Sequence, residues 1–208
     1  MDNKKFQDKK DKMAKILAKI DAVKFGVFKL STGKASPYYV DLRVVPSFPD
    51  AFRDICDFYA ETITSQVGLK NFDRIAAVPI TGIPFASQIA YNLKKPFLYV
   101  RKSIKLQGRE RRVEGILFSG DRVLIVDDLA TTGVTLRKTA EAIRAEGGVV
   151  TQAIAFLDRE EGATEKLAEI GVQLIALLKI SDVANAMYET GAIDEESLKT
   201  IMKQIKKK

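Results

Sequence analysis

The fold is decided by the stretch Val123-Leu-Ile-Val-Asp-Asp-Leu-Ala-Thr-Thr-Gly-Val-Thr135. Its first four residues are apolar and predict a short strand buried on both faces, as in a parallel sheet. Asp127 and Asp128, the acidic pair, follow where we expect that strand to end. A polar turn at residues 131–133, the threonine turn, then leads into a helical pattern. We therefore expect backbone N–H groups and the positive end of a helix dipole to lie beside two anions. Such an arrangement predicts that the turn binds a phosphate and that the carboxylates bind sugar hydroxyls or a metal.

The alternative is an ordinary helix start after a core strand, since Thr and Gly are common at helix N-termini. A purely structural cap has no use for two consecutive acids, so we favour a binding site. The stretch resembles the phosphoribosyl-pyrophosphate (PRPP) signature of type I phosphoribosyltransferases. The resemblance implies that the acids hold the ribose hydroxyls near a developing positive charge, and that the turn takes the 5′-phosphate. It assigns to PRPP the residues Asp127, Asp128, Leu129, Ala130, Thr131, Thr132, Gly133, Val134 and Thr135.

The composition is that of an ordinary globular protein. The chain has 208 residues, 46% hydrophobic and 29% charged, which is enough for one large domain with a substantial core. No apolar run approaches the roughly 18 residues of a membrane helix. The first residues lack the apolar stretch of a signal peptide, so we expect a cytoplasmic protein without a membrane partner.

The residue types present restrict the chemistry. The chain has one cysteine, Cys56, which excludes an internal disulfide, and no histidine, which excludes Ser-His-Asp and Cys-His catalysis. Much of the net charge of +7 comes from lysines near the two ends. The internal basic cluster between Arg101 and Arg112 suits a small polyanionic substrate at least as well as DNA, so we expect no nucleic-acid partner.

Residues 25–45 predict two short strands around a turn at Thr32 and Gly33, with the second strand reaching Val45. The alternative is a plain hairpin with core or surface aromatics. The motifs Gly-x-Phe-x-Leu, Ser-Pro-Tyr-Tyr and Asp-Leu-Arg resemble the N-terminal region of orotate phosphoribosyltransferases, which covers the pyrimidine. We call this part, about residues 1–45, the hood. The resemblance implies that Tyr39 and Val40 contact orotate, together with Thr131.

Residues 101–115, the basic loop, begin with Arg-Lys-x-x-Lys. The alternative is a solvated surface loop. The segment resembles the mobile catalytic loop of the same family, which implies PRPP contacts from Arg101, Lys102, Lys105 and Gln107. Lys102 and Lys105 would be catalytic together with the acidic pair. In the family this loop closes over PRPP in the neighbouring subunit, so a homodimer is implied.

Two further strand ends carry candidate residues. A strand at residues 74–78 leads to Thr81 and Gly82, which suit a close approach to an anion but equally an ordinary strand–helix connection. The resemblance implies a pyrophosphate contact here, often with a non-proline cis peptide. A strand at residues 149–157 ends in Asp158 and Arg159. They could be a surface ion pair, whereas the resemblance implies that Arg159 holds the orotate carboxylate.

Strands alternating with helices over residues 74–190 predict an α/β fold with a central parallel sheet flanked by helices. The resemblance implies the type I phosphoribosyltransferase fold. We expect a single domain, 1–208, with a core at about 46–190 and a closing helix at about 194–206. The candidate residues all follow strands, and ligands of such folds bind at the carboxyl ends of strands. Helices are expected at 8–22, 50–66, 84–92, 165–169, from Ser181 to Tyr188, and at 194–205.

The resemblance implies transfer of a phosphoribosyl group from PRPP to orotate, giving orotidine 5′-monophosphate and pyrophosphate. Mg²⁺ would be bound mainly through PRPP and water, near the acidic pair, and no residue is assigned as its direct ligand. Gln107, Thr81 and Ser31 depart from the histidine and lysines common in the family, which puts their individual roles in doubt. The alternatives are a transferase for another base and a PRPP-sensing regulator with the same fold.

Overall fold

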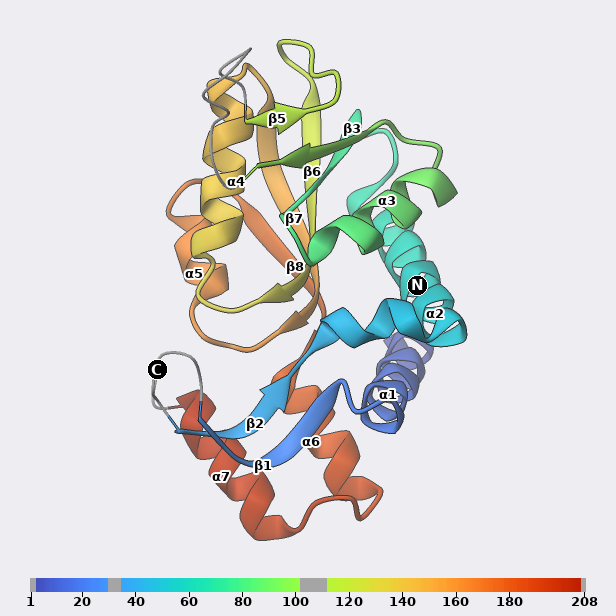
Figure 1. The fold of residues 1–208 in the computed structure, drawn as a ribbon, viewed down its shortest axis with the longest axis vertical. Coiled ribbons are helices and arrows are strands. Elements are labelled where there is room, and N and C mark those ends of the chain that lie inside the picture. Colours follow the sequence, from blue (N-terminus) through green and yellow to red (C-terminus); the bar gives the residue numbers. More distant parts are fainter. Residues whose placement is uncertain (1–2, 30–34, 102–111, 207–208) are drawn as a thin grey trace.

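A six-stranded sheet forms the centre of the computed structural model, which describes residues 3–29, 35–101 and 112–206 (Figure 1). Its strand order is β5-β4-β3-β6-β7-β8. Four pairs of neighbours are parallel, and only β5 runs antiparallel, beside β4 at the edge. The predicted parallel sheet is therefore confirmed. The strands are β3 (Arg74–Ala77), β4 (Phe97–Val100), β5 (Val113–Glu114), β6 (Arg122–Ala130), β7 (Val149–Asp158) and β8 (Gln173–Lys179).

Side chains of β6 point alternately into two hydrophobic clusters. Leu124 and Val126 pack with residues of α1, α2, α3 and α6 on one face of the sheet. Val123 and Ile125 pack with α4 and α5 on the other face. The prediction of a strand buried on both faces is confirmed, since a period of two sends neighbouring side chains to opposite layers. The helices are α1 (Asn3–Lys19), α2 (Pro49–Thr62), α3 (Gly82–Asn92), α4 (Val134–Ala145), α5 (Ala163–Ala168), α6 (Ile180–Glu189) and α7 (Glu195–Lys206).

The strands of the hood form a separate antiparallel pair, β1 (Val23–Lys29) and β2 (Ala35–Val40), which lies below the main sheet in Figure 1. Helix α7 contacts β2, and α6 contacts both α1 and α7. The carboxyl ends of the central strands point toward this layer (Figure 1). Loops at that edge of the sheet therefore face the hood.

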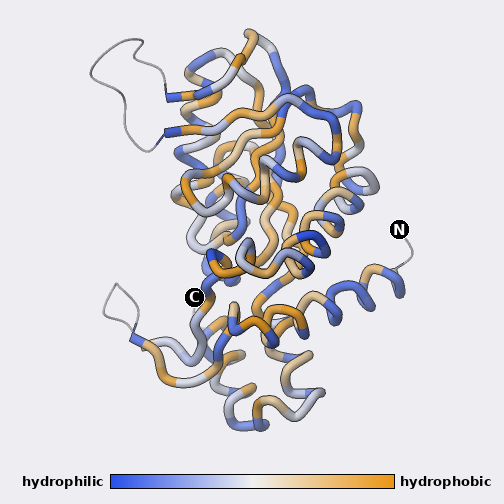
Figure 2. The backbone as a smooth tube through the Cα atoms, turned by 45° about the vertical axis from the view of Figure 1, so that its right-hand side comes forward, coloured by the Kyte–Doolittle hydropathy of each residue, from blue (hydrophilic) through white to orange (hydrophobic). Residues whose placement is uncertain are grey.

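Helix α1 carries its apolar residues on one side. Met13 and Leu17 are buried in the core, whereas the lysines of this helix colour it hydrophilic in Figure 2. The helix lies earlier than the expected 8–22, because the chain turns at Asp21, whose φ is 58°, before β1 begins. None of the described helices is long and apolar enough to cross a membrane.

Two strand boundaries differ from the prediction. Strand β6 continues to Ala130, so the acidic pair lies within it and not after its end. Its partner β7 is long enough to pair with it through the acids, with Asp127 opposite Ala155. The second hood strand ends at Val40, not Val45, because residues 42–47 form a 3-10 helix, η1 (Leu42–Ser47).

Further differences concern a loop and several helices. The short strand β5 lies inside the expected basic loop, where it pairs with β4. Helix α6 begins at Ile180, one residue before the expected Ser181, and the Lys179 N–H donates to Asp182 Oδ2 at 2.9 Å. Helix α5 begins two residues before the expected 165, and the expected helix 50–66 is α2 followed by a π-helical turn, η2 (Ile63–Val67).

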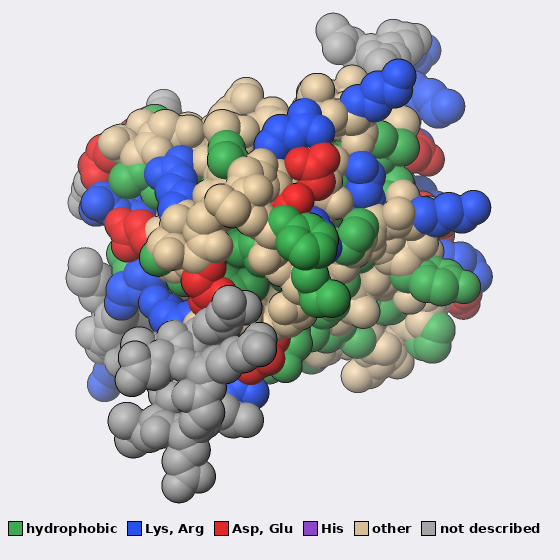
Figure 3. Space-filling view, turned by 90° about the horizontal axis from the view of Figure 1, so that it is seen from above, with side chains coloured by type: hydrophobic (Ala, Val, Ile, Leu, Met, Phe, Trp, Pro, Cys, Tyr) green, Lys and Arg blue, Asp and Glu red, His purple; other side chains and the backbone are tan. Residues whose placement is uncertain are grey.

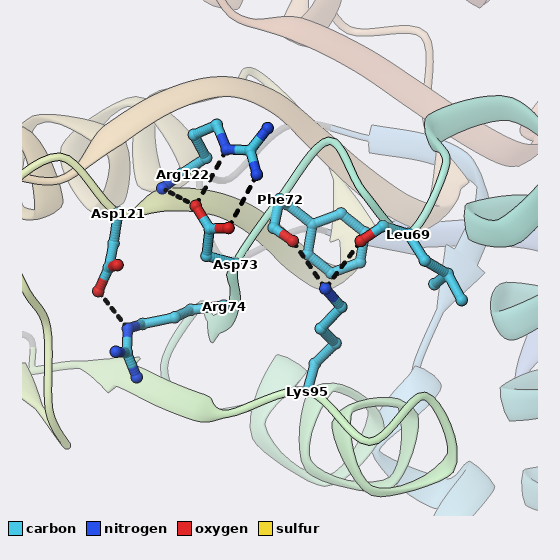
Figure 4. Close-up of polar contacts among 7 residues, drawn as sticks. All are labelled: Leu69, Phe72, Asp73, Arg74, Lys95, Asp121 and Arg122. Carbon is cyan, nitrogen blue, oxygen red and sulfur yellow. Dashed lines mark hydrogen bonds and ion pairs between the residues drawn. The ribbon is translucent and has the colours of Figure 1, made fainter.

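Ion pairs join β3 and β6 at their amino ends (Figure 4). The Arg122 guanidinium donates to both oxygens of Asp73, at 2.8 and 3.0 Å, and Arg74 pairs with Asp121. Because each pair crosses between the segments that start the two strands, it holds them in register. Basic and acidic side chains are interspersed over the end of the molecule seen in Figure 3.

Candidate functional site

A cavity of about 330 Å³ lies between the carboxyl ends of the strands and the hood. It collects segments far apart in the sequence: the end of β2 and start of η1, the loop after β3, and the end of β6 with the threonine turn. The acidic pair and the Thr81 loop meet at one edge of the sheet, as expected, whereas Arg101 and Arg159 do not line the cavity. The lining residues are Val40, Asp41, Leu42, Arg43, Val78, Pro79, Thr81, Asp127, Asp128, Leu129, Thr131, Gly133, Thr135 and Leu136.

The acidic pair is almost fully buried, with Asp127 5% and Asp128 4% exposed. The backbone N–H of Asp128 donates to Asp127 Oδ1 at 3.0 Å, and the Tyr59 hydroxyl donates to the carbonyl oxygen of Asp127. Burial, and then the neighbouring charge of Asp128, raise the pKa of Asp127 well above its usual value. Burial therefore disfavours the charged form of Asp127.

The loop after β3 contacts the acidic pair directly. Thr81 Oγ1 donates to Asp128 Oδ1 at 2.7 Å. The Pro79–Ile80 peptide is cis, as the resemblance implied for this loop. A Cβ at Gly82 would lie 2.8 Å from Asp127 Oδ1 and 3.2 Å from the carbonyl oxygen of Val126. Only glycine lets the start of α3 approach β6 this closely.

The threonine turn ends at Gly133, whose φ of 76° is left-handed. A Cβ there would also lie 3.0 Å from the backbone of Ala163. Helix α4 starts immediately after it, and its first N–H groups have no partners within the helix. Thr131 and Thr135 line the cavity beside them. This geometry suits a phosphate. Among the described residues assigned to PRPP, five do not line the cavity: Gly82, Arg101, Ala130, Thr132 and Val134.

Arg159 does not line the cavity, although it follows β7 as predicted. Its N–H donates to the carbonyl oxygen of Ala130 at 2.9 Å, next to the threonine turn. The guanidinium lies 5.0 Å from the Tyr38 ring centroid, and its Nη2 is 2.9 Å from Glu161 Oε1. The ion pair is largely buried, with side chains 11% and 14% exposed, so it is neither on the surface nor made with Asp158.

Tyr39 does not line the cavity either, whereas its neighbour Val40 does. The Tyr39 ring is 37% exposed and lies 5.7 Å from the ring of Phe28. Its hydroxyl accepts a hydrogen bond from Arg43 Nη2 at 3.3 Å. The hood therefore reaches the cavity through residues 40–43.

The basic loop is described only at its ends. Arg101 pairs with Glu114, with 2.5 Å between Nε and Oε1, and its N–H donates to the carbonyl oxygen of Arg112 at 2.8 Å. Arg101 does not line the cavity. The other candidate residues there, Lys102, Lys105 and Gln107, lie outside the described residues, as does Ser31 of the hood.

Sequence reasoning missed three cavity or supporting residues. Asp41 and Arg43 were noted only as part of a motif, although their Asp-x-Arg spacing was a signal for a local ion pair. Tyr59 has the helical spacing of a core residue, and nothing in its sequence context indicates the hydrogen bond to Asp127.

Residues 49–180 match the phosphoribosyl transferase domain family. A relative from Cenarchaeum symbiosum (strain A), named orotate phosphoribosyltransferase, is 42% identical over 180 residues, covering 86% of this chain and 90% of that one. The chain belongs to the orotate phosphoribosyltransferase family. It is therefore a transferase.

Solved structures agree with this membership. The crystal structure of orotate phosphoribosyltransferase from Aeropyrum pernix has a TM-score of 0.76 and 35% identity, covering 88% of this chain and 99% of that one. The structure of Leishmania donovani UMP synthase has a TM-score of 0.82 and 30% identity, covering 95% of this chain but 42% of that one. The chain thus spans less than half of the UMP synthase chain.

Proposed function

We propose that the cavity is where this orotate phosphoribosyltransferase moves the 5-phosphoribosyl group from PRPP to orotate, in pyrimidine biosynthesis. The products are orotidine 5′-monophosphate and pyrophosphate. The observation that carries the proposal is the shared wall of Asp127, Asp128 and the start of α4. A sugar phosphate needs acceptors for its hydroxyls and donors for its phosphate, and this wall supplies both side by side.

The reaction needs charge stabilisation and no strong base. A nitrogen of anionic orotate forms a bond with C1 of the ribose, while the C1–O bond breaks and its electron pair leaves with pyrophosphate. Positive charge develops on the ribose ring, where the acidic pair would stabilise it. The N–H groups at the start of α4, with the hydroxyls of Thr131 and Thr135, would hold the 5′-phosphate. A chain without histidine suits this chemistry.

The described wall does not supply enough cations for such a polyanion. Among the described lining residues only Arg43 is cationic, and Asp41 already pairs with it. We therefore keep Lys102 and Lys105 as catalytic residues, with Arg101 and Gln107 as further PRPP contacts. They would act from the basic loop of the partner subunit, so that a homodimer forms the complete site. The Arg-Lys-x-x-Lys motif and the charge shortfall support this arrangement.

The cavity suits Mg²⁺ only if PRPP supplies most of the ligands of the ion. The described residues contain no group of three or more His, Cys, Asp or Glu side chains that could hold a metal. The acidic pair offers hard oxygen ligands at the cavity wall, and PRPP oxygens and water would complete the coordination. The ion would supply positive charge to the leaving pyrophosphate.

For orotate we propose contacts from Tyr39, Val40, Thr131 and Arg159. Val40 and Thr131 line the cavity, and Tyr39 precedes Val40 in the chain. Arg159 offers a planar fork of donors that matches a carboxylate. We also propose that residues 1–208 act as a single domain and that the reaction takes place in the cytoplasm, on the composition given above.

A spectrophotometric assay tests the function. Purified protein with PRPP and Mg²⁺ is expected to consume orotate, seen as a loss of orotate absorbance. Adenine, guanine and uracil, offered in place of orotate, should not react. No turnover of orotate would refute the proposal, and turnover of another base would reassign the substrate. Salt-sensitive binding of DNA without orotate turnover would favour a regulator.

A further inference from the structure

Arg43 is held at the cavity by an unusually complete set of contacts. Its Nε donates to Asp41 Oδ1 at 2.6 Å and its Nη2 to Asp41 Oδ2 at 2.8 Å. Nη2 also donates to the Tyr39 hydroxyl at 3.3 Å, and the Arg43 backbone N–H donates to Asp41 Oδ1 at 3.2 Å. One edge of the guanidinium is therefore saturated.

The opposite edge is available. A guanidinium carries five N–H donors in one plane, and two of them are on Nη1. In the part of the chain that the structure describes, no acceptor is bonded to Nη1. Arg43 is one of the residues that line the cavity, and its side chain is 63% exposed, so the guanidinium is accessible to a ligand.

Stability is a poor explanation for this arrangement. An exposed ion pair contributes little to stability, because water screens it and ordering a long side chain costs entropy. Arg53 makes the ordinary kind of exposed pair: it is 65% exposed and contacts Asp50 at 3.0 Å across one helical turn. Arg43 instead has two contacts from one carboxylate and a third from a tyrosine. The result is a defined position for its free edge.

We propose that Arg43 binds the pyrophosphate group of PRPP through Nη1, and that Asp41 is its positioning residue. This inference rests on the proposed function. Arg43 shares its cavity with Pro79 and Thr81, the loop assigned to pyrophosphate, and it is the one cation among the described lining residues. The start of α4 already accounts for the 5′-phosphate. Pyrophosphate is therefore the substrate anion that still lacks a described positive partner.

Steady-state kinetics of Arg43→Gln test the contact. The KM for PRPP and the inhibition constant of pyrophosphate are each expected to rise about tenfold or more, the usual effect of losing a hydrogen bond to a charged group. The KM for orotate should change less than twofold. Arg53→Gln is the matched control and should leave all three constants unchanged. Arg43→Lys, which keeps the charge without the fork, should fall between the wild type and Arg43→Gln.

A double-mutant cycle tests the positioning role of Asp41. Asp41→Asn should raise the KM for PRPP in the wild-type background and have no further effect in the Arg43→Gln background, because Asp41 acts through Arg43. Additive effects would show that Asp41 acts by itself and would overturn this role. Direct binding of PRPP to each variant, with thermal unfolding as a check of folding, gives a second measurement.

The experiments distinguish a wrong assignment of Arg43 from a wrong proposed function. If the wild type turns over orotate but Arg43→Gln leaves both pyrophosphate constants unchanged, or raises only the KM for orotate, the assignment of Arg43 is wrong and the function stands. If the wild type does not turn over orotate, the proposed function itself fails. Weaker binding of pyrophosphate alone to Arg43→Lys and Arg43→Gln supports the contact without relying on turnover.

Discussion

At the scale of single residues, burial sets how readily Asp127 loses its proton. Its pKa is raised by burial and then by Asp128, so its charged form destabilises the folded protein above the usual carboxyl pKa. Stability from this group is therefore gained as pH falls through the raised value. Asp127→Asn removes the charge but keeps an acceptor for the Asp128 N–H. We expect an unchanged or higher melting temperature at pH 7, and turnover lower by about 100-fold or more.

Thermal unfolding between pH 3 and 8, beside the orotate assay, checks this prediction. The difference in melting temperature between variant and wild type should shrink toward low pH, where Asp127 is protonated in both states of the wild type. A clear fall in melting temperature at pH 7 would contradict it, because it would show that the charged carboxylate stabilises the fold.

The residue scale also shows how far sequence reasoning reaches. The acidic pair was found because two consecutive acids after an apolar strand have no structural use. Arg43 was not found as a site residue, because its role depends on the fold bringing residue 43 to the cavity that residue 128 lines. Arg159 was found, but its pairing with Glu161 within a largely buried contact is visible only in three dimensions.

At the scale of elements, the threonine turn depends on Gly133. Alanine there would be strained by the positive φ and would also press on Ala163. Gly120→Ala is the matched control, since its φ of 86° is similar but nothing lies within 4 Å of an added Cβ. We expect Gly120→Ala to cost about 1 kcal/mol of unfolding free energy and Gly133→Ala about 2–3 kcal/mol.

Denaturant unfolding measures the loss of unfolding free energy in each variant. Measurement of PRPP binding shows whether the binding site is affected as well. Gly133→Ala should also weaken PRPP binding, because α4 would start in a different position, whereas Gly120→Ala should not. Equal costs for the two variants would show that the backbone conformation matters and the contact with Ala163 does not.

Element types were predictable where a pattern was local, and element ends were not. The four apolar residues at 123–126 predicted a buried strand, but its end at Ala130 is set by pairing with β7. Acids have low strand propensity, so the sequence pattern stops at Val126. In the same way, the hood strand ends early because Asp41 accepts a hydrogen bond from the Arg43 N–H and starts η1.

At the scale of the whole molecule, the amino edge of the sheet links stability to pH. Hydrogen bonds from Arg122 lower the pKa of Asp73, and hydrogen bonds from Arg74 lower that of Asp121. An acid with a lowered folded pKa adds stability above its usual pKa and loses it as pH falls through the folded value.

We expect Asp73→Asn to destabilise the protein at pH 7 and this difference to shrink below about pH 4. Urea unfolding of wild type and variant across pH 3–7 tests it, and a difference independent of pH would contradict the assignment.

Complementation between two inactive variants tests the shared site of the proposed homodimer. Lys105→Ala should lower turnover by about 100-fold while the fold survives, and Asp128→Asn should do likewise.

After subunit exchange in an equal mixture, half of the dimers carry one of each variant. If the basic loop acts on the neighbouring subunit, one of the two sites in such a dimer has an intact loop and an intact acid, so about a quarter of wild-type activity should return. If the loop acts within its own subunit, every site keeps one defect and no activity returns. The recovered activity therefore distinguishes a dimer that completes the site from one that only holds two independent sites together.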